Sequence, residues 1–138
     1  MSAIAVLQRG VAAAALHVNG SEPSDRDRHP PPVGSREPTC FIVRVEGELD
    51  AAVLPEFSAA LERAVTSSFR AVVVDLRPTR FLSIGSASAL AAAKERAALD
   101  GVDLRVVAGR REVERVLEVT GLRPLFRFYS SVQDALEA

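Results

Sequence analysis

The sequence predicts an α/β protein: a single domain with a four- to five-stranded, mostly parallel sheet and about four helices. Three observations support this fold class. The chain has 138 residues and is 48% hydrophobic, which suits one packed core. From Phe41 onward, segments with strand and helix periodicity alternate, a pattern typical of parallel sheets with helical crossovers. The run of three valines at 72–74 is typical of a central strand covered on both faces.

The composition divides the chain into three parts. Residues 1–18 contain one candidate for a first strand, the apolar run at 11–18. Residues 19–39 are rich in proline, charge and small polar side chains, so we expect a flexible loop or linker. Residues 40–138 form the expected domain.

The expected elements alternate along that domain. Apolar alternation or valine enrichment predicts the strands, and apolar residues at spacings of three and four predict the helices. The expected strands lie within 41–50, where the strand stops at Gly47, and at 69–76, 102–108 and 125–129. The expected helices are 54–65, 86–99, 110–121 and 130–138.

Charge and composition argue against several classes of function. The net charge is -1 and the isoelectric point is near 6.1, so no global field favours nucleic acid or an anionic membrane. The single cysteine, Cys40, has no internal disulfide partner, and we therefore expect a reducing cytoplasm. With only two histidines, we expect neither a metal site nor a cofactor.

A serine cluster lies where the strand at 69–76 gives way to the next helix. Ser83, Ser86 and Ser88 suit a nucleophile, a phosphate-accepting switch or a helix cap. A nucleophilic serine needs an adjacent base, and both histidines, His17 and His29, lie in the N-terminal segment. The sequence also lacks a nucleophile elbow and a phosphate loop. We therefore expect no enzyme and no catalytic residues, with a small hydrolase using Ser86 as the remaining catalytic alternative.

Two further groups of charged residues have two interpretations each. Four acids at expected strand ends suit either acid–base chemistry or caps and solvated edges: Glu46, Glu48, Asp50 and Asp75. Arginines in the last third suit either an ion-paired helix face or a docking surface for an acidic partner: Arg105, Arg110, Arg111, Arg115, Arg123 and Arg127.

Three motifs together resemble the STAS domain of bacterial anti-sigma factor antagonists. They are "GELD" before a proline-opened helix, "VVVDL" and "FL" before the serine junction, and "VLEVTGL" ahead of "LFRFYSSVQDAL". The resemblance covers roughly residues 41–138. It implies a non-catalytic protein that binds an anti-sigma factor, often also an ATP-dependent serine kinase, and thereby releases a sigma factor. It also implies that the first strand, expected at 11–18, pairs as a hairpin with the strand at 41–50.

Around the serines, the chain departs from the family pattern F-[LM]-D-S-S-G-L. Gly85 occupies the acceptor position, Ser83 replaces the aspartate and Ser86 replaces the glycine. Glycine has no hydroxyl, so the resemblance leaves Ser86 as the first phosphorylation candidate, then Ser83, with Ser88 weaker. Ser86 is equally suited to be the N-cap of the following helix. Val53 stands where a threonine often caps the first helix.

The resemblance implies a partner-binding surface and one alternative function. The implied binding residues are Asp50, Phe81, Leu82, Ser83, Ile84, Gly85 and Ser86. The alternative is a scaffold subunit of a signalling assembly that has lost the phosphorylation switch. The sequence leaves the identity of the partner and the oligomeric state open.

Overall fold

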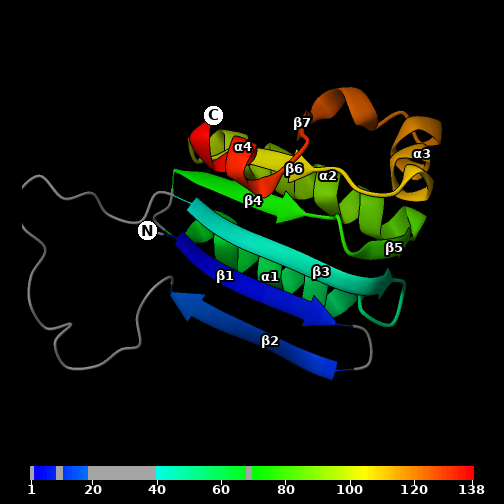
Figure 1. Cartoon of the computed structure of the whole chain (residues 1–138), viewed down its shortest axis with the longest axis horizontal. Coiled ribbons are helices and arrows are strands. Elements are labelled where there is room, and N and C mark those ends of the chain that lie inside the picture. Colours follow the sequence, from blue (N-terminus) through cyan, green and yellow to red (C-terminus); the bar gives the residue numbers. More distant parts are fainter. Residues whose placement is uncertain (1, 9–10, 19–39, 68–69) are drawn as a thin grey trace, which may run out of the picture.

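The computed structural model describes residues 2–8, 11–18, 40–67 and 70–138. The loop or linker expected at 19–39 lies outside these residues. Within them, the chain forms a mixed sheet with two long helices on one face, a short helix on the other, and a further helix at one end of the sheet (Figure 1). The predicted α/β class, with a mostly parallel sheet and four helices, is confirmed.

The strands form a seven-stranded sheet in the order β2-β1-β3-β4-β6-β7, with β5 paired to the end of β3. All pairings are parallel except β1 with β2. The strands are β1 (Ser2–Gln8), β2 (Val11–Val18), β3 (Cys40–Leu49), β4 (Ala71–Asp75), β5 (Thr79–Leu82), β6 (Asp103–Val107) and β7 (Arg127–Tyr129).

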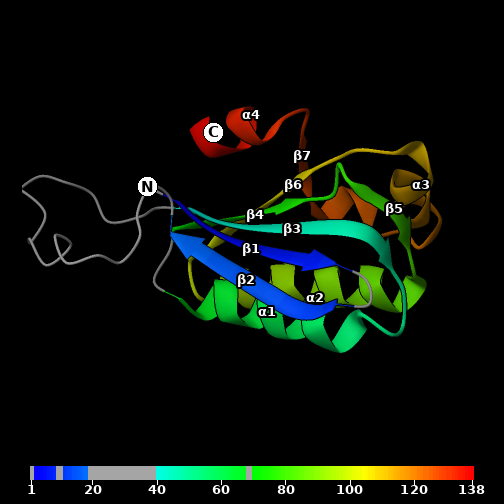
Figure 2. The same ribbon diagram turned by 60° about the horizontal axis from the view of Figure 1, so that its bottom comes forward.

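The helices follow the strands in the order that the sequence predicted. They are α1 (Leu54–Thr66), α2 (Ile84–Leu99), α3 (Arg111–Val119) and α4 (Val132–Glu137), with a 3-10 turn, η2 (Arg123–Leu125), before β7. Figure 2 shows α1 and α2 side by side beneath the sheet and α4 above it. The sheet therefore has a helix on each face, as the buried β4 strand requires.

The N-terminal strands differ from the expectation in their pairing. The segment at 11–18 is a strand, β2, but it does not pair with β3. Instead β1 lies between them, antiparallel to β2 and parallel to β3. The implied hairpin between 11–18 and 41–50 is therefore wrong, because β2 forms its hairpin with β1, and β1 is the strand that pairs with β3.

Two packed cores result from the alternation of side chains along the central strands. Val72 and Val74 point toward α1 and α2 and join the larger core, which includes Phe57 and Leu90. Val73 points the other way, into a smaller core beneath α4. Each face of β4 is thus covered, which fixes the carboxyl ends of β3 and β4 beside β5 and the start of α2.

Candidate functional site

Ser83, and not Ser86, caps α2. The Ser83 Oγ accepts a hydrogen bond from the backbone N–H of Ser86 at 3.1 Å, and the helix begins at Ile84. The Ser83 hydroxyl also donates to the Ser86 Oγ at 3.0 Å, and the Ser86 hydroxyl donates to the carbonyl oxygen of Leu49 at 3.3 Å. The interpretation of Ser86 as the N-cap is therefore wrong, because the helix starts two residues earlier than its serine and alanine pattern indicated.

The three serines differ in their access to solvent. Ser86 is fully buried, Ser83 is half-buried and Ser88 is exposed. Gly85 is also exposed, and a Cβ added to it would meet only the Leu54 Cδ2 at 3.4 Å. The position at which the family pattern places its acceptor is thus open to solvent here, but it carries no hydroxyl.

Two large apolar side chains lie exposed beside this junction. Phe81 at the end of β5 is 47% exposed, and Ile84 at the start of α2 is 67% exposed. Leu82, between them, is 1% exposed and belongs to the core. We call the exposed residues Phe81, Ile84, Gly85 and Ser88 the junction surface. Leu82 lies outside it, because its side chain is buried in the core.

Asp50 shapes the neighbouring loop. Its carboxylate accepts hydrogen bonds from the backbone N–H groups of Ala52 at 3.0 Å and Val53 at 3.3 Å. Val53 is the N-cap of α1 and makes no side-chain capping bond, as its replacement of a threonine predicted. Because the Leu49 carbonyl accepts from both the Ser83 N–H and the Ser86 hydroxyl, the Asp50 loop and the α2 start are fixed to each other.

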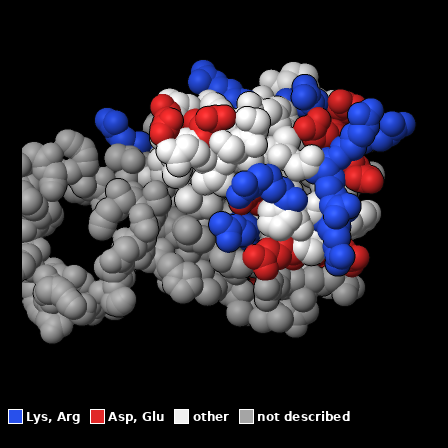
Figure 3. All heavy atoms as spheres, in the orientation of Figure 1, with Lys and Arg blue, Asp and Glu red and all other residues white. Residues whose placement is uncertain are grey.

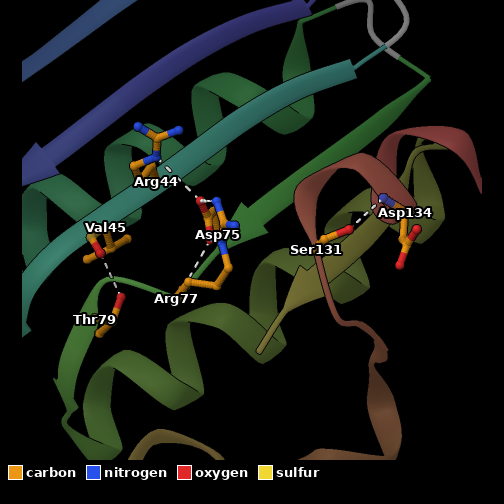
Figure 4. A network of polar contacts seen from close by, with 7 residues as sticks. All are labelled: Arg44, Val45, Asp75, Arg77, Thr79, Ser131 and Asp134. Atoms are coloured by element: carbon orange, nitrogen blue, oxygen red, sulfur yellow. Dashed lines mark hydrogen bonds and ion pairs between the residues drawn. The ribbon is translucent and has the colours of Figure 1, made fainter. Parts of the chain in front are cut away.

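Asp75 is buried in an ion-paired network on the α4 side of the sheet (Figure 4). Arg77 donates from Nε to Oδ1 at 2.9 Å and from Nη2 to Oδ2 at 3.0 Å, and Arg44 Nε lies 3.3 Å from Oδ2. Burial by itself raises the pKa of the Asp75 carboxyl, but the hydrogen bonds and charge of Arg77, with the charge of Arg44, outweigh burial and lower it. A carboxylate held ionised in this way is a poor general acid, and its geometry is that of a structural ion pair.

The same close-up shows a second polar tie near the junction. The buried Thr79 donates its hydroxyl to the carbonyl oxygen of Val45 at 2.7 Å and so fastens β5 to β3 (Figure 4).

At the far end of the chain, the Ser131 Oγ accepts from the backbone N–H of Asp134 at 3.0 Å. Ser131 is therefore the N-cap of α4, and Ser131 and Asp134 have the spacing of a capping box.

Basic and acidic side chains are interspersed on the face that carries α4 (Figure 3). Arginines gather over α3 and β5, with acids among them. Arg123 lies 3.8 Å from both Glu114 and Glu118 and stacks over the Phe128 ring at 4.8 Å. Arg105 pairs with Asp103 at 2.9 Å. For these two arginines, the ion-paired interpretation holds.

The described part of the chain holds neither a metal-binding cluster nor a membrane-spanning helix. There, no group of three or more histidine, cysteine or acidic side chains could hold a metal ion. Within the same residues, no helix is both long and apolar enough to cross a membrane.

Comparison with known proteins agrees with the fold and the motifs. The STAS domain family matches residues 33–135. An anti-sigma-F factor antagonist, RsfB, of Mycobacterium tuberculosis is 30% identical over 95 residues, which is 69% of this chain and 77% of that protein. An anti-sigma factor antagonist from Mycobacterium paratuberculosis, known as a crystal structure, superposes with a TM-score of 0.66 at 30% identity, over 75% of this chain and 87% of that one.

A more distant likeness concerns the fold alone. The anti-sigma factor antagonist SpoIIAA in its unphosphorylated form superposes with a TM-score of 0.61 at 13% identity, over 70% of this chain and 85% of that chain. The residues that match the STAS domain family, 33–135, include both the Asp50 loop and the junction surface. From its sequence and its fold alike, the chain belongs to the STAS domain family.

Proposed function

We propose that this protein is a cytoplasmic anti-sigma factor antagonist that binds an anti-sigma factor through the junction surface and thereby releases a sigma factor. The observation that carries the proposal is the exposure of Phe81 and Ile84, three residues apart in the chain at the junction of β5 and α2. Large apolar side chains that are exposed together are typical of a surface that another protein covers. The relatives named as anti-sigma factor antagonists at 30% identity supply the class of partner.

The rigid setting of these residues supports the same proposal. Ile84 is held by the Ser83 cap, and β5 is held by the Thr79 bond to Val45. Such pre-organised anchors lose little conformational entropy on binding. Asp50 lies in the loop fixed to the same junction through Leu49, so it belongs at the rim of the proposed interface.

Control by a serine kinase is also part of the proposal, with Ser88 as its site. The sequence favoured Ser86, but a fully buried hydroxyl that bonds to Ser83 and Leu49 is closed to a kinase. Ser88 is exposed and lies four residues after Ile84, on the same helix face. A phosphate there adds about -1.5 to -2 charges beside the apolar anchor, which opposes docking.

A binding measurement tests the proposal. The purified chain is titrated by calorimetry with the anti-sigma factors encoded in its own genome, alone and in complex with their sigma factors. We expect one of them to bind and to release its sigma factor. Ile84→Asp should weaken that binding at least about tenfold, because it places a charge at the centre of the contact. Val119→Asp is the matched control, since Val119 is 71% exposed on α3 and outside the junction surface.

The opposite results would discard the proposal. If none of the anti-sigma factors binds and the chain instead assembles into large particles, it is a scaffold subunit. If Ile84→Asp and Val119→Asp weaken binding equally, the anti-sigma factor binds elsewhere on the domain.

A further inference from the structure

A groove with a volume of about 240 Å³ runs between α1 and α2 on the side of these helices that faces away from the sheet. Figure 2 shows the two helices side by side at the bottom of the molecule. The groove is separate from the junction surface, because none of its lining residues belongs to that surface. Its lining residues are Ser58, Leu61, Glu62, Val65, Ala89, Ala92, Ala93 and Arg96.

The lining residues form one stripe on each helix. On α1 they recur at spacings of three and four from Ser58 to Val65, and on α2 they recur identically from Ala89 to Arg96. Both helices follow parallel strands on one face of the sheet, so they run in the same direction. The approach of Leu54 to Gly85 sets their relative level at the N-terminal end.

The α2 helix has small or apolar residues on its outer side as well as its inner side. Ala92 is exposed in the groove, and Leu99, seven residues further along the same stripe, is 83% exposed. A helix with solvent on its outer side ordinarily carries polar residues there. Three alanines line the α2 side of the groove, and their short side chains let another helix approach closely.

The charges of the two helices are opposite. Within α1, Glu56 and Glu62 outweigh Arg63, for a net charge of -1. Within α2, Lys94 and Arg96 outweigh Glu95, for a net charge of +1. Glu62 and Arg96 both line the groove, one on each side of it. A face with this pattern is complementary to itself.

We propose that this face is the interface of a homodimer, in which α1 of one copy packs against α2 of the other. A two-fold axis parallel to the helices places Glu62 of each copy within reach of Arg96 of the other, and the two grooves close into the core of a four-helix bundle. The alternative axis, perpendicular to the helices, would place α1 against α1 and α2 against α2, so that like charges meet.

The size of the interface predicts a reversible dimer. Helices of 13 and 16 residues are about 20 and 24 Å long, so the contact lies at the lower end of specific interfaces. Arg96 already has an exposed contact with Asp100, with its Nε 3.4 Å from Oδ2. Such an exposed pair contributes little and can be exchanged for the contact with Glu62. The proposed dimer forms through the groove between α1 and α2 and does not require binding of an anti-sigma factor.

Sedimentation equilibrium of the full chain over about a hundredfold range of concentration tests the dimer. We expect the weight-average mass to rise from 14.8 kDa toward twice that value. Ala92→Glu should raise the dissociation constant at least about tenfold, because it places an unpaired charge at the dimer core. Ala59→Glu, on an exposed position of α1 outside the groove, is the matched control and should leave dimerisation unchanged. Circular dichroism melts at low concentration confirm that both variants fold.

A charge exchange tests which helices meet. Glu62→Arg and Arg96→Glu should each weaken self-association, since each variant then places like charges across the interface. An equimolar mixture of the two variants should associate as strongly as the unmodified chain, because every pair across the interface is again opposite in sign. A chain that stays monomeric throughout would overturn the proposal. So would equal effects of Ala92→Glu and Ala59→Glu, or a mixture that associates no better than either variant alone.

Discussion

Ser83 and Ser86 hold each other in place at the start of α2: the Ser83 hydroxyl oxygen accepts from the Ser86 N–H at 3.1 Å, and its hydroxyl donates to the Ser86 Oγ at 3.0 Å. The pair joins the junction to β3, because Ser86 donates onward to the Leu49 carbonyl. Two of the three serines at the junction therefore have structural partners, and only Ser88 among them is exposed.

Removing the cap should loosen the helix. Ser83→Ala deletes the acceptor for the Ser86 N–H, and we expect the free energy of unfolding to fall by about 1 kcal/mol. Ser88→Ala removes an exposed hydroxyl from the same helix and should change stability by less than about 0.5 kcal/mol. Urea unfolding of both variants measures the difference. A larger loss for Ser88→Ala than for Ser83→Ala would contradict the assigned cap.

Restoring a hydroxyl at position 85 should create a kinase site. The space around Gly85 admits a Cβ with only one contact, at 3.4 Å from Leu54, so Gly85→Ser should fold normally. With the serine kinase that acts on this protein, we expect phosphate at position 85 in the variant, located by mass spectrometry of the tryptic peptide. The phosphorylated form should bind the anti-sigma factor at least about tenfold more weakly.

A second variant makes that experiment specific. Ser88→Ala combined with Gly85→Ser removes our proposed natural site while leaving the new one. Phosphate on this double variant must lie at position 85 or on a serine other than Ser88. Failure of the kinase to modify it would mean that access to position 85 is closed in the complex with the kinase.

Replacing the buried carboxylate should change the response to acid. The pKa of Asp75 is lowered from its ordinary value of 3.8 by Arg77 and Arg44 against the opposing effect of burial. A carboxyl whose pKa is lower in the folded state stabilises the protein above the unfolded pKa, and this stabilisation is lost as pH falls through the folded pKa. The free energy of unfolding should therefore decline from about pH 5 downward.

Asp75→Asn removes this pH-dependent contribution, so the free energy of unfolding of the variant should fall less steeply below about pH 5 than that of the unmodified chain. At neutral pH the variant should lose about 1 to 2 kcal/mol, because the hydrogen bonds to the buried carboxylate are lost while the two arginines, each more than a third exposed, can turn to water. Asp100→Asn is the matched control because Asp100 forms an exposed pair with Arg96. Thermal unfolding between pH 3 and pH 7 is the measurement, and equal acid limbs for the unmodified chain and Asp75→Asn would contradict the prediction.

A glycine after β6 should tolerate no side chain. A Cβ on Gly109 would lie 2.6 Å from the Cα of Arg77 and 2.8 Å from the carbonyl oxygen of Leu76. Because both are backbone atoms, the β4–β5 connection would have to move, and we expect Gly109→Ala to cost at least about 2 kcal/mol. Gly85→Ala, which meets only a side-chain methyl group, should instead be neutral or stabilise by up to about 1 kcal/mol. Chemical denaturation compares the two.

The elements that the sequence predicted well are those whose pattern is local and strong. The valines at 72–74 predicted β4, and every residue of that strand is buried. β5 was missed because it has four residues, of which the central Arg80 and Phe81 are both exposed. A strand this short carries too few alternating positions to be recognised. The start of α2 was misplaced because Ile84 and Gly85 are weak helix formers.

The binding role of the candidate site residues stays a prediction, although the structure gives their positions and exposure. Asp50, Phe81 and Ile84 were identified through the family resemblance, and they lie at one edge of the domain. Leu82 was included among the binding residues, but it is buried in the core. The difference between Phe81 and Leu82 depends on which face of β5 meets the helices, and no local pattern of four residues reveals that.

The sequence by itself determined the order of strands and helices from residue 40 onward, the family motifs and the lack of a hydroxyl at position 85. These properties depend on residue identity and on periodicities of two and 3.6 residues, which are local. The tertiary structure alone decided that Ser86 is buried, that Arg44 pairs with Asp75 and that α1 and α2 together form a groove. Burial and pairing between residues far apart in the chain depend on which surfaces pack together, and that is settled only when the whole sheet and its helices assemble.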